Sequence, residues 1–235
     1  MPDSYYDLGD HHRPITTGSE TAQLWFDRGY RWCEVFNYEE ALGCFETAAR
    51  KDPDAAMAHW GIALASGPNY NKAWRLFGEE DLRESTARAC SAIRRAKALT
   101  GPGAPVERAL IEALASRVPD DGRPVDAEEF SELDVAYAEA MRNVYREHGD
   151  DLDVAALFAD ALMCVSPRAL WDLDTGEPIG YGTLEAREVI EKGLATPDGP
   201  DHPVLNHLYI HLMEMSPHPE LAIRAADRLR TMAPD

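Results

Sequence analysis

The sequence predicts an all-α protein in which about five antiparallel helix pairs follow one another along the chain. In consecutive segments of helix length, apolar residues recur every three to four positions, as on the buried face of an amphipathic helix. No segment alternates apolar and polar residues with the period of two that a half-buried strand requires. Prolines and polar turns separate the segments and group them into pairs.

The composition is that of a globular protein and excludes several classes of partner. The 235 residues are 45% hydrophobic and 28% charged, enough for one elongated array or one to two compact domains. With 23 Lys and Arg residues against 42 Asp and Glu residues, the net charge is −19, so we expect no nucleic acid partner. No apolar run is long enough to span a bilayer, and we expect no membrane association.

The expected location is the cytoplasm. The N-terminal residues have neither the basic region nor the apolar region of a secretory signal. The four cysteines contain no CxxC pair, which is typical of small buried residues in a reducing compartment; they are Cys33, Cys44, Cys90 and Cys164.

The first helix pair has the clearest pattern, in AQLWFDRGYRWCEVFNYEEALGCFETAARKDPD. Gly29 and Ala41 allow two antiparallel helices to approach closely, Phe45 fills the seam, and Pro53 ends the second helix. The segment resembles a tetratricopeptide repeat, whose pattern of about 34 residues is matched, except at Arg28 where Leu is usual, by Trp25, Gly29, Trp32, Ala41, Phe45, Ala48 and Pro53. The resemblance implies a right-handed α-solenoid.

The chain therefore divides into an N-terminal arm, residues 1–18, and a helical-repeat domain, residues 19–235. The five pairs are expected at 19–53, 54–100, 104–149, 151–196 and 202–234. Three of them carry long inserts between their helices, on one face of the array. The sequence stops without a polar capping helix, so we expect either a fragment of a longer protein or an end that pairs with a second copy as a homodimer.

The segment HLYIHLME is the strongest candidate for chemistry. On a helix, His207, His211 and Glu214 fall within an arc of roughly 60°. Such a set can hold a divalent transition metal such as Zn, Fe or Cu, with His12 of the arm as a further ligand. The alternative interpretation is a polar stripe that satisfies buried groups between helices. Asn206 precedes the motif and is counted among the ligand-binding candidates.

Further ligand-binding candidates lie in the helices and inserts of the preceding pairs. His59 occupies the groove-facing position that Trp25 has in the first repeat, as a substrate contact, a further metal ligand or an aromatic packing group. The turn GPNYN contributes Asn69, Tyr70 and Asn71, because a loop that only leaves a helix needs no Tyr between two Asn residues. Trp171 anchors the insert WDLDTGEP, which we expect to fold over the groove.

Taken together, the segments HRPITT, AQLWFDRGYRW, FNYEEALGCFETA, AMAHWGIALASGPNYN and HLYIHLMEMSPHPE resemble a group of bacterial and fungal tetratricopeptide-repeat proteins. The group has FNHEEA where this chain has FNYEEA, with Tyr38 in place of a His. The resemblance implies that GPNYN and HLYIHLME do more than pack the repeat.

Three functions follow as hypotheses. The first is a scaffold whose concave groove binds a peptide, a protein or a small molecule, with a preference for basic or apolar ligands. The second is a metal-dependent enzyme or metal-binding protein, in which Glu214 or Asp160 acts as a base on metal-bound water. The third is an assembly module that dimerises through its end.

Overall fold

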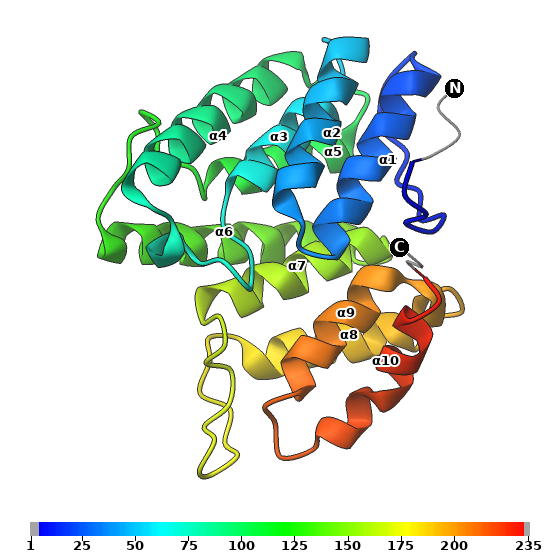
Figure 1. The fold of residues 1–235 in the computed structure, drawn as a ribbon, viewed down its shortest axis with the longest axis vertical. Coiled ribbons are helices and arrows are strands. Elements are labelled where there is room, and N and C mark those ends of the chain that lie inside the picture. The colour runs from blue at the N-terminus through cyan, green and yellow to red at the C-terminus, as the bar shows by residue number, and fades with distance from the viewer. Residues whose placement is uncertain (1–4, 233–235) are drawn as a thin grey trace.

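The computed structural model describes residues 5–232, and over that range the protein is all-helical (Figure 1). The α-helices are α1 (Glu20–Glu34), α2 (Tyr38–Lys51), α3 (Ala56–Ser66), α4 (Glu79–Leu99), α5 (Pro105–Ala115), α6 (Ala127–His148), α7 (Leu152–Val165), α8 (Thr183–Leu194), α9 (Pro203–Met213) and α10 (Ile223–Leu229). Three short 3-10 turns complete the list: η1 (Trp74–Leu76), η2 (Gly199–Asp201) and η3 (Pro219–Ala222). The described residues contain isolated β-bridges but no strand. The predicted all-α class is confirmed.

The helices pack in consecutive pairs. Each of the five predicted ranges contains two α-helices, and the two helices of each pair contact each other: α1 with α2, α3 with α4, α5 with α6, α7 with α8, and α9 with α10. No described helix is both long and apolar enough to cross a membrane.

Short polar side chains begin several of these helices. The Ser19 hydroxyl accepts from the Ala22 amide at the start of α1, and Asn37 caps α2 in the same way. Asp126 and Asp151 cap α6 and α7 with their carboxylates. Each cap satisfies amides that the first turn of a helix leaves unpaired, which stabilises a helix by about 0.5–2 kcal/mol.

Phe45 of α2 lies between two glycines that set the distance to the neighbouring helices. A Cβ atom built on Gly29 of α1 would come within 2.8 Å of the Phe45 ring, and one on Gly61 of α3 would overlap it. The ring itself is fully buried. Because neither glycine has a side chain, α1 and α3 both approach α2 closely around this ring, as the repeat pattern predicted for Gly29.

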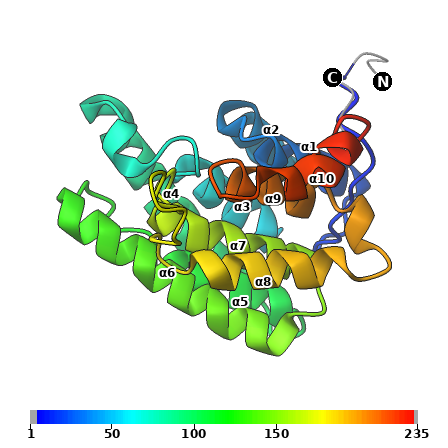
Figure 2. The same cartoon turned by 90° about the horizontal axis from the view of Figure 1, so that it is seen from below.

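Helix α9 has the most varied surroundings among the last three helices. It contacts α8 and α10, and it also reaches α7 and the first helix, α1 (Figures 1 and 2). The described part of the arm runs along α1 and places Leu8 in the core. The array thus brings the HLYIHLME helix against the start of the chain, which positions the site described below.

Substitution of Gly61 by Ala tests the packing around Phe45. We expect Gly61→Ala to lower the free energy of unfolding by about 1–3 kcal/mol, because the added methyl group overpacks the seam. The matched control is Gly43→Ala on the exposed side of α2, where nothing lies within 4 Å. There the substitution should stabilise the protein by about 0.5–1 kcal/mol. Urea unfolding measures both; equal stability of Gly61→Ala and the wild type would contradict this packing.

Candidate functional site

His207 and His211 face each other on α9. Their Nε2 atoms are 3.1 Å apart, and the i, i+4 spacing of the helix makes this approach possible. Each ring is held from its other side. The Nδ1 of His207 bonds the backbone carbonyl oxygen of Glu34 at the end of α1. The Nδ1 of His211 lies 2.9 Å from Oε1 of Glu214, which follows one turn later. The two rings and their partners form one continuous row.

The chemistry of the partners fixes the protons of this row. A carbonyl oxygen only accepts, so His207 carries its proton on Nδ1 and presents the Nε2 lone pair to His211. Burial lowers the pKa of His207 despite its hydrogen bond to Glu34, and the ring is therefore neutral near pH 7. A carboxylate of Glu214 likewise requires the proton of His211 on Nδ1. With both protons on Nδ1, two Nε2 lone pairs face each other, and either a proton shared between them or a bound cation satisfies them.

Aromatic rings enclose the pair. Phe36 lies against both imidazoles, with ring centroids 4.6 Å from His207 and 5.5 Å from His211. Tyr70 of the GPNYN turn lies 5.1 Å from the His211 ring, so the two motifs singled out in the sequence meet. The Tyr70 side chain is only 1% exposed, and its hydroxyl has no hydrogen-bond partner. Burial raises the pKa of Tyr70 to about 12, which keeps the hydroxyl protonated.

Phe36 beside this pair and Arg168 beside the GPNYN turn have strained backbone conformations. Phe36 has φ +59°, and Arg168 has φ +62°; these are the non-glycine residues with positive φ in the described part of the chain. Arg168 donates to the Asn71 side-chain oxygen at 2.9 Å, which ties it to the GPNYN turn. Such strain costs of the order of 1–3 kcal/mol per residue and persists where the surroundings enforce it, most often at functional sites.

Several other sequence candidates hold the backbone in place. The Asn69 side chain accepts from the amides of Asn71 and Lys72 and closes the GPNYN turn. Asn206 donates to the carbonyl oxygens of Pro200 and His202. Trp171 donates from its indole nitrogen to the Leu212 carbonyl, which fastens its insert to the C-terminal end of α9.

Three candidates lie apart from the histidine pair. His59 Nε2 bonds the Pro53 carbonyl at 3.0 Å. His12, whose side chain is 53% exposed, bonds Asp27 at 2.8 Å. Asp160 of α7 is buried beside a cavity of about 30 Å³, enough space for one water molecule, which Glu34 and Phe36 also line. Burial raises the pKa of Asp160, against the attraction of Arg117, and the Cys164 thiol donates to its carboxyl group.

A second cluster, absent from the sequence interpretation, lies where the arm crosses α7 and the start of α9. His11, Asp153 and His202 form the one group in residues 5–232 with three or more potential metal ligands whose donor atoms lie within 4.8 Å of one another. His11 Nε2 is 2.9 Å from Asp153 Oδ1 and 3.4 Å from Glu34 Oε1. We refer to these four residues as the arm cluster.

The arm cluster is buried and carries strong electrostatic coupling. Burial alone would raise the pKa of Asp153, but contacts with His11, His202 and Arg13 hold it well below its usual range. Arg13 bonds both Asp153 and Asp151, so its charge is compensated. Burial raises the pKa of Glu34 to about 8, which makes this carboxyl group largely protonated at pH 7.

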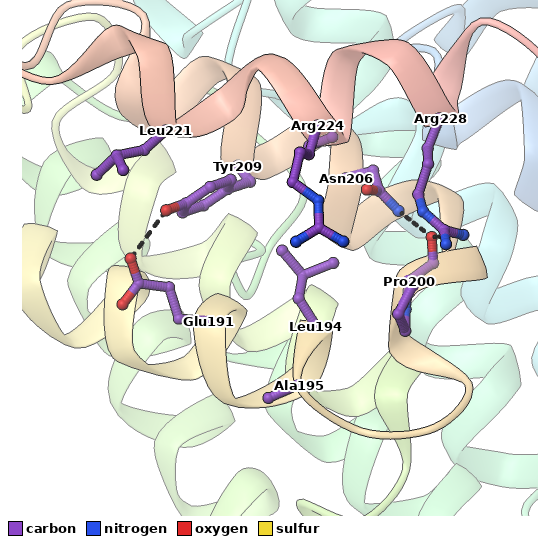
Figure 3. Close-up of a pocket in the computed structure, with 10 residues that line it drawn as sticks. Glu191, Leu194, Ala195, Pro200, Asn206, Tyr209, Leu221, Arg224 and Arg228 are labelled. Carbon is purple, nitrogen blue, oxygen red and sulfur yellow. Dashed lines mark hydrogen bonds between the residues drawn. The ribbon is translucent and has the colours of Figure 1, made fainter.

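A larger cavity of about 320 Å³ lies between α8, α9 and α10 (Figure 3). Tyr209 donates to Glu191 at one side, and Arg228 is paired with Asp201 at the other. Between them, Arg224 extends toward Leu194 and makes no ion pair with any described residue (Figure 3). The remaining wall is mostly apolar and comes from Leu194, Ala195, Pro200, Leu221 and Ala225.

No family model matches the chain, and no curated protein is significantly similar to it.

Asp160 gives a prediction for the pH dependence of stability. Its folded pKa is raised above the unfolded value of 3.8, so the folded state binds more protons between those two values. This contribution to stability is complete below pH 3.8 and is lost as pH rises through the folded pKa. Asp160→Asn should therefore gain stability relative to the wild type as pH increases. Urea unfolding at pH 4 and pH 7.5 measures this; a gain that shrinks with increasing pH would contradict it.

Proposed function

We propose that this chain is a helical-repeat protein of the tetratricopeptide type that binds a divalent transition metal ion through Nε2 of His207 and of His211. The supporting observation is the pairing of these atoms at 3.1 Å while an acceptor holds Nδ1 of each ring. With metal–nitrogen bonds of about 2.0–2.1 Å, that separation corresponds to an angle of roughly 100° at the ion. This angle suits adjacent positions of a tetrahedral or octahedral site.

The partners of the two rings support the same assignment. Metal-binding histidines usually donate their second N–H group to a carbonyl or a carboxylate, which fixes the tautomer. Glu34 supplies the carbonyl and Glu214 the carboxylate. In this proposal Glu214 orients His211 instead of binding the ion, a different role from the one its spacing predicted. Imidazole ligands suit Zn, Cu, Ni and Fe.

The surroundings leave part of the coordination sphere for a small ligand. Two protein nitrogen atoms fill fewer positions than any of these metals requires. The protonated, unpartnered hydroxyl of Tyr70 belongs to a ring in contact with His211 and is a hydrogen-bond donor for such a ligand. Phe36 covers the two imidazole rings and limits their exposure to water.

The cavity of Figure 3 favours groove binding as a second candidate function. Its volume of about 320 Å³ is in the range of small-molecule sites. Arg224, without an ion-pair partner among residues 5–232, favours a ligand that combines an apolar body with a carboxylate. From the low content of Lys and Arg, the sequence predicted basic or apolar ligands for the groove. In this cavity, however, the unpaired charge among the described residues is the positive charge of Arg224, which favours an acidic ligand.

Metal titration of the untagged protein tests the histidine pair. After treatment with a chelator, we expect the wild type to bind Co²⁺ or Zn²⁺, and His207→Ala and His211→Ala each to lose one bound equivalent. Glu214→Gln should keep that equivalent with about 10–100-fold weaker affinity, because the orienting charge is lost. Isothermal titration calorimetry and the visible spectrum of Co²⁺ report both changes.

The matched control is His59→Ala, which removes a histidine whose ring bonds Pro53 and leaves metal binding unchanged. Retention of every equivalent by both His207→Ala and His211→Ala would refute the proposal, provided that their circular dichroism shows a folded protein.

A short apolar peptide tests the second candidate. We expect it to bind with a free C-terminal carboxylate and to lose at least about tenfold in affinity either as its amide or on Arg224→Ala, because each change removes a charge-assisted hydrogen bond. Fluorescence anisotropy of the labelled peptide measures this. Arg230→Ala, an exposed arginine outside the cavity lining, is the control. Equal binding of acid and amide would exclude a carboxylate site.

A further inference from the structure

The histidine pair leaves the arm cluster of His11, Glu34, Asp153 and His202 unexplained. Its members come from the arm, the end of α1, the start of α7 and the cap of α9, and they meet in one buried volume. Each offers an atom that commonly binds metals, two imidazole nitrogens and two carboxylate oxygens. The cluster is separate from the histidine pair, although Glu34 touches both: its carbonyl bonds His207 and its carboxyl group lies beside His11.

The distances within the arm cluster resemble the edges of a coordination polyhedron. His11 Nε2 lies 2.9 Å from Asp153 Oδ1 and 3.4 Å from Glu34 Oε1, and His202 Nε2 lies 3.3 Å from Asp153 Oδ1. Ligand atoms bound tetrahedrally at about 2.0–2.1 Å from a zinc ion are themselves about 3.3–3.4 Å apart. His11, Asp153 and His202 thus need little movement to bind one ion, and the carboxyl group of Glu34, 3.4 Å from His11, joins them by turning toward Asp153 and His202.

Two of these atoms are buried without a hydrogen-bond partner. Glu34 Oε1 and His202 Nε2 both lack one, although their side chains are only 6% and 5% exposed. A buried polar atom left unpaired destabilises the folded state. His202 Nε2 lies near Asp153 but does not form a hydrogen bond with it. Glu34 Oε1 likewise lies near His11 without a hydrogen bond. A shared ion satisfies both orphaned atoms at once.

We propose that the arm cluster binds a divalent first-row transition metal ion through His11 Nε2, Glu34 Oε1, Asp153 Oδ1 and His202 Nε2. The carboxylates of Glu34 and Asp153 balance the charge of the ion. Arg13 adds no net positive charge, because Asp151 pairs with it as well as Asp153. Two imidazoles with two carboxylates suit Zn, Fe and Mn.

One contact must be given up. His202 Nδ1 accepts from the Leu205 amide at 3.3 Å and so caps α9, which places the proton of a neutral ring on Nε2. Binding of an ion at Nε2 moves that proton to Nδ1 and breaks the cap, which removes its contribution to the stability of α9. The loss of one helix cap is small beside the binding free energy of a structural metal site.

Solvent reaches the arm cluster at His11, and a bound ion would hold the arm against three helices. His11 lines an open cavity of about 720 Å³ together with Asp10, Asp201 and Arg228. Four protein ligands close the coordination sphere, which is the arrangement of structural metal sites. Because His11 belongs to the arm, the ion would fasten the arm to α1, α7 and α9. This role does not depend on metal binding at His207 and His211.

Glu34→Gln is the sharpest test, because its Oε1 makes no hydrogen bond and the substitution preserves the shape of the side chain. In titrations with Zn²⁺ and Co²⁺, we expect two equivalents for the wild type. In Glu34→Gln, the affinity for one of these two equivalents should fall by at least about 10–100-fold. Mutation of a residue that only hydrogen-bonds a metal ligand already causes a loss of that size. His11→Ala removes a different ligand and should have the same effect. His12→Ala, also on the arm but bonded to Asp27, should keep both equivalents.

Hydrogen exchange provides an independent readout. Zn²⁺ should slow amide exchange of residues 8–16 in the wild type and in His207→Ala, but not in Glu34→Gln. A single equivalent that is lost in His207→Ala and unaffected by Glu34→Gln and His11→Ala would overturn this inference and leave the proposed function intact. A single equivalent with the reverse response would support the arm site and refute the histidine pair. A wild type that binds neither ion would overturn both.

Discussion

The contact between the end of α1 and the middle of α9 organises both candidate sites. Glu34 is the last residue of α1, and its carbonyl oxygen accepts from His207 of α9. Its carboxyl group points into the arm cluster beside His11. If α9 did not reach α1, His207 would have no fixed tautomer and the arm cluster would lose one side. The fold therefore places one buried acidic residue between two sets of histidines, and the properties of each set follow from that placement.

Both sets contain polar atoms for which the described part of the chain provides too few hydrogen-bond partners. In the histidine pair, an acceptor at each Nδ1 directs the two Nε2 atoms toward each other at 3.1 Å. In the arm cluster, Glu34 and His202 each bury an atom without a hydrogen bond. A proton shared between the rings relieves the first conflict, whereas the second leaves two buried atoms outside hydrogen-bond geometry. A divalent cation resolves each conflict with atoms that are already in place.

The sequence predicted those features that depend on neighbours along the chain. Helix periodicity and the Gly29, Ala41 and Phe45 pattern predicted the first pair, and i, i+4 spacing predicted that His207 and His211 would meet. The same local logic failed to predict the bond from Glu214 to Nδ1 of His211, because spacing places a carboxylate near a ring but does not select the ring nitrogen. His11 and Asp153 are separated by 142 residues, so only the folded arm shows that they meet. The neighbouring His12 has the same local sequence context, and the sequence predicted His12 as the metal ligand of the arm instead of His11.

Coordination number distinguishes the expected roles of the two sites. The arm cluster offers four protein ligands in a buried volume, which leaves an ion no open position and suits a structural role. The histidine pair offers two ligands beside a buried phenol and a strained aromatic residue, Phe36, so an ion there retains open positions for exchangeable ligands. Phe36 keeps its positive φ against the imidazoles of α9, and an ion that fastens the arm across α1, α7 and α9 would add to the rigidity of that contact. The arm site would thus support the pair through Glu34, the residue that the two sites share.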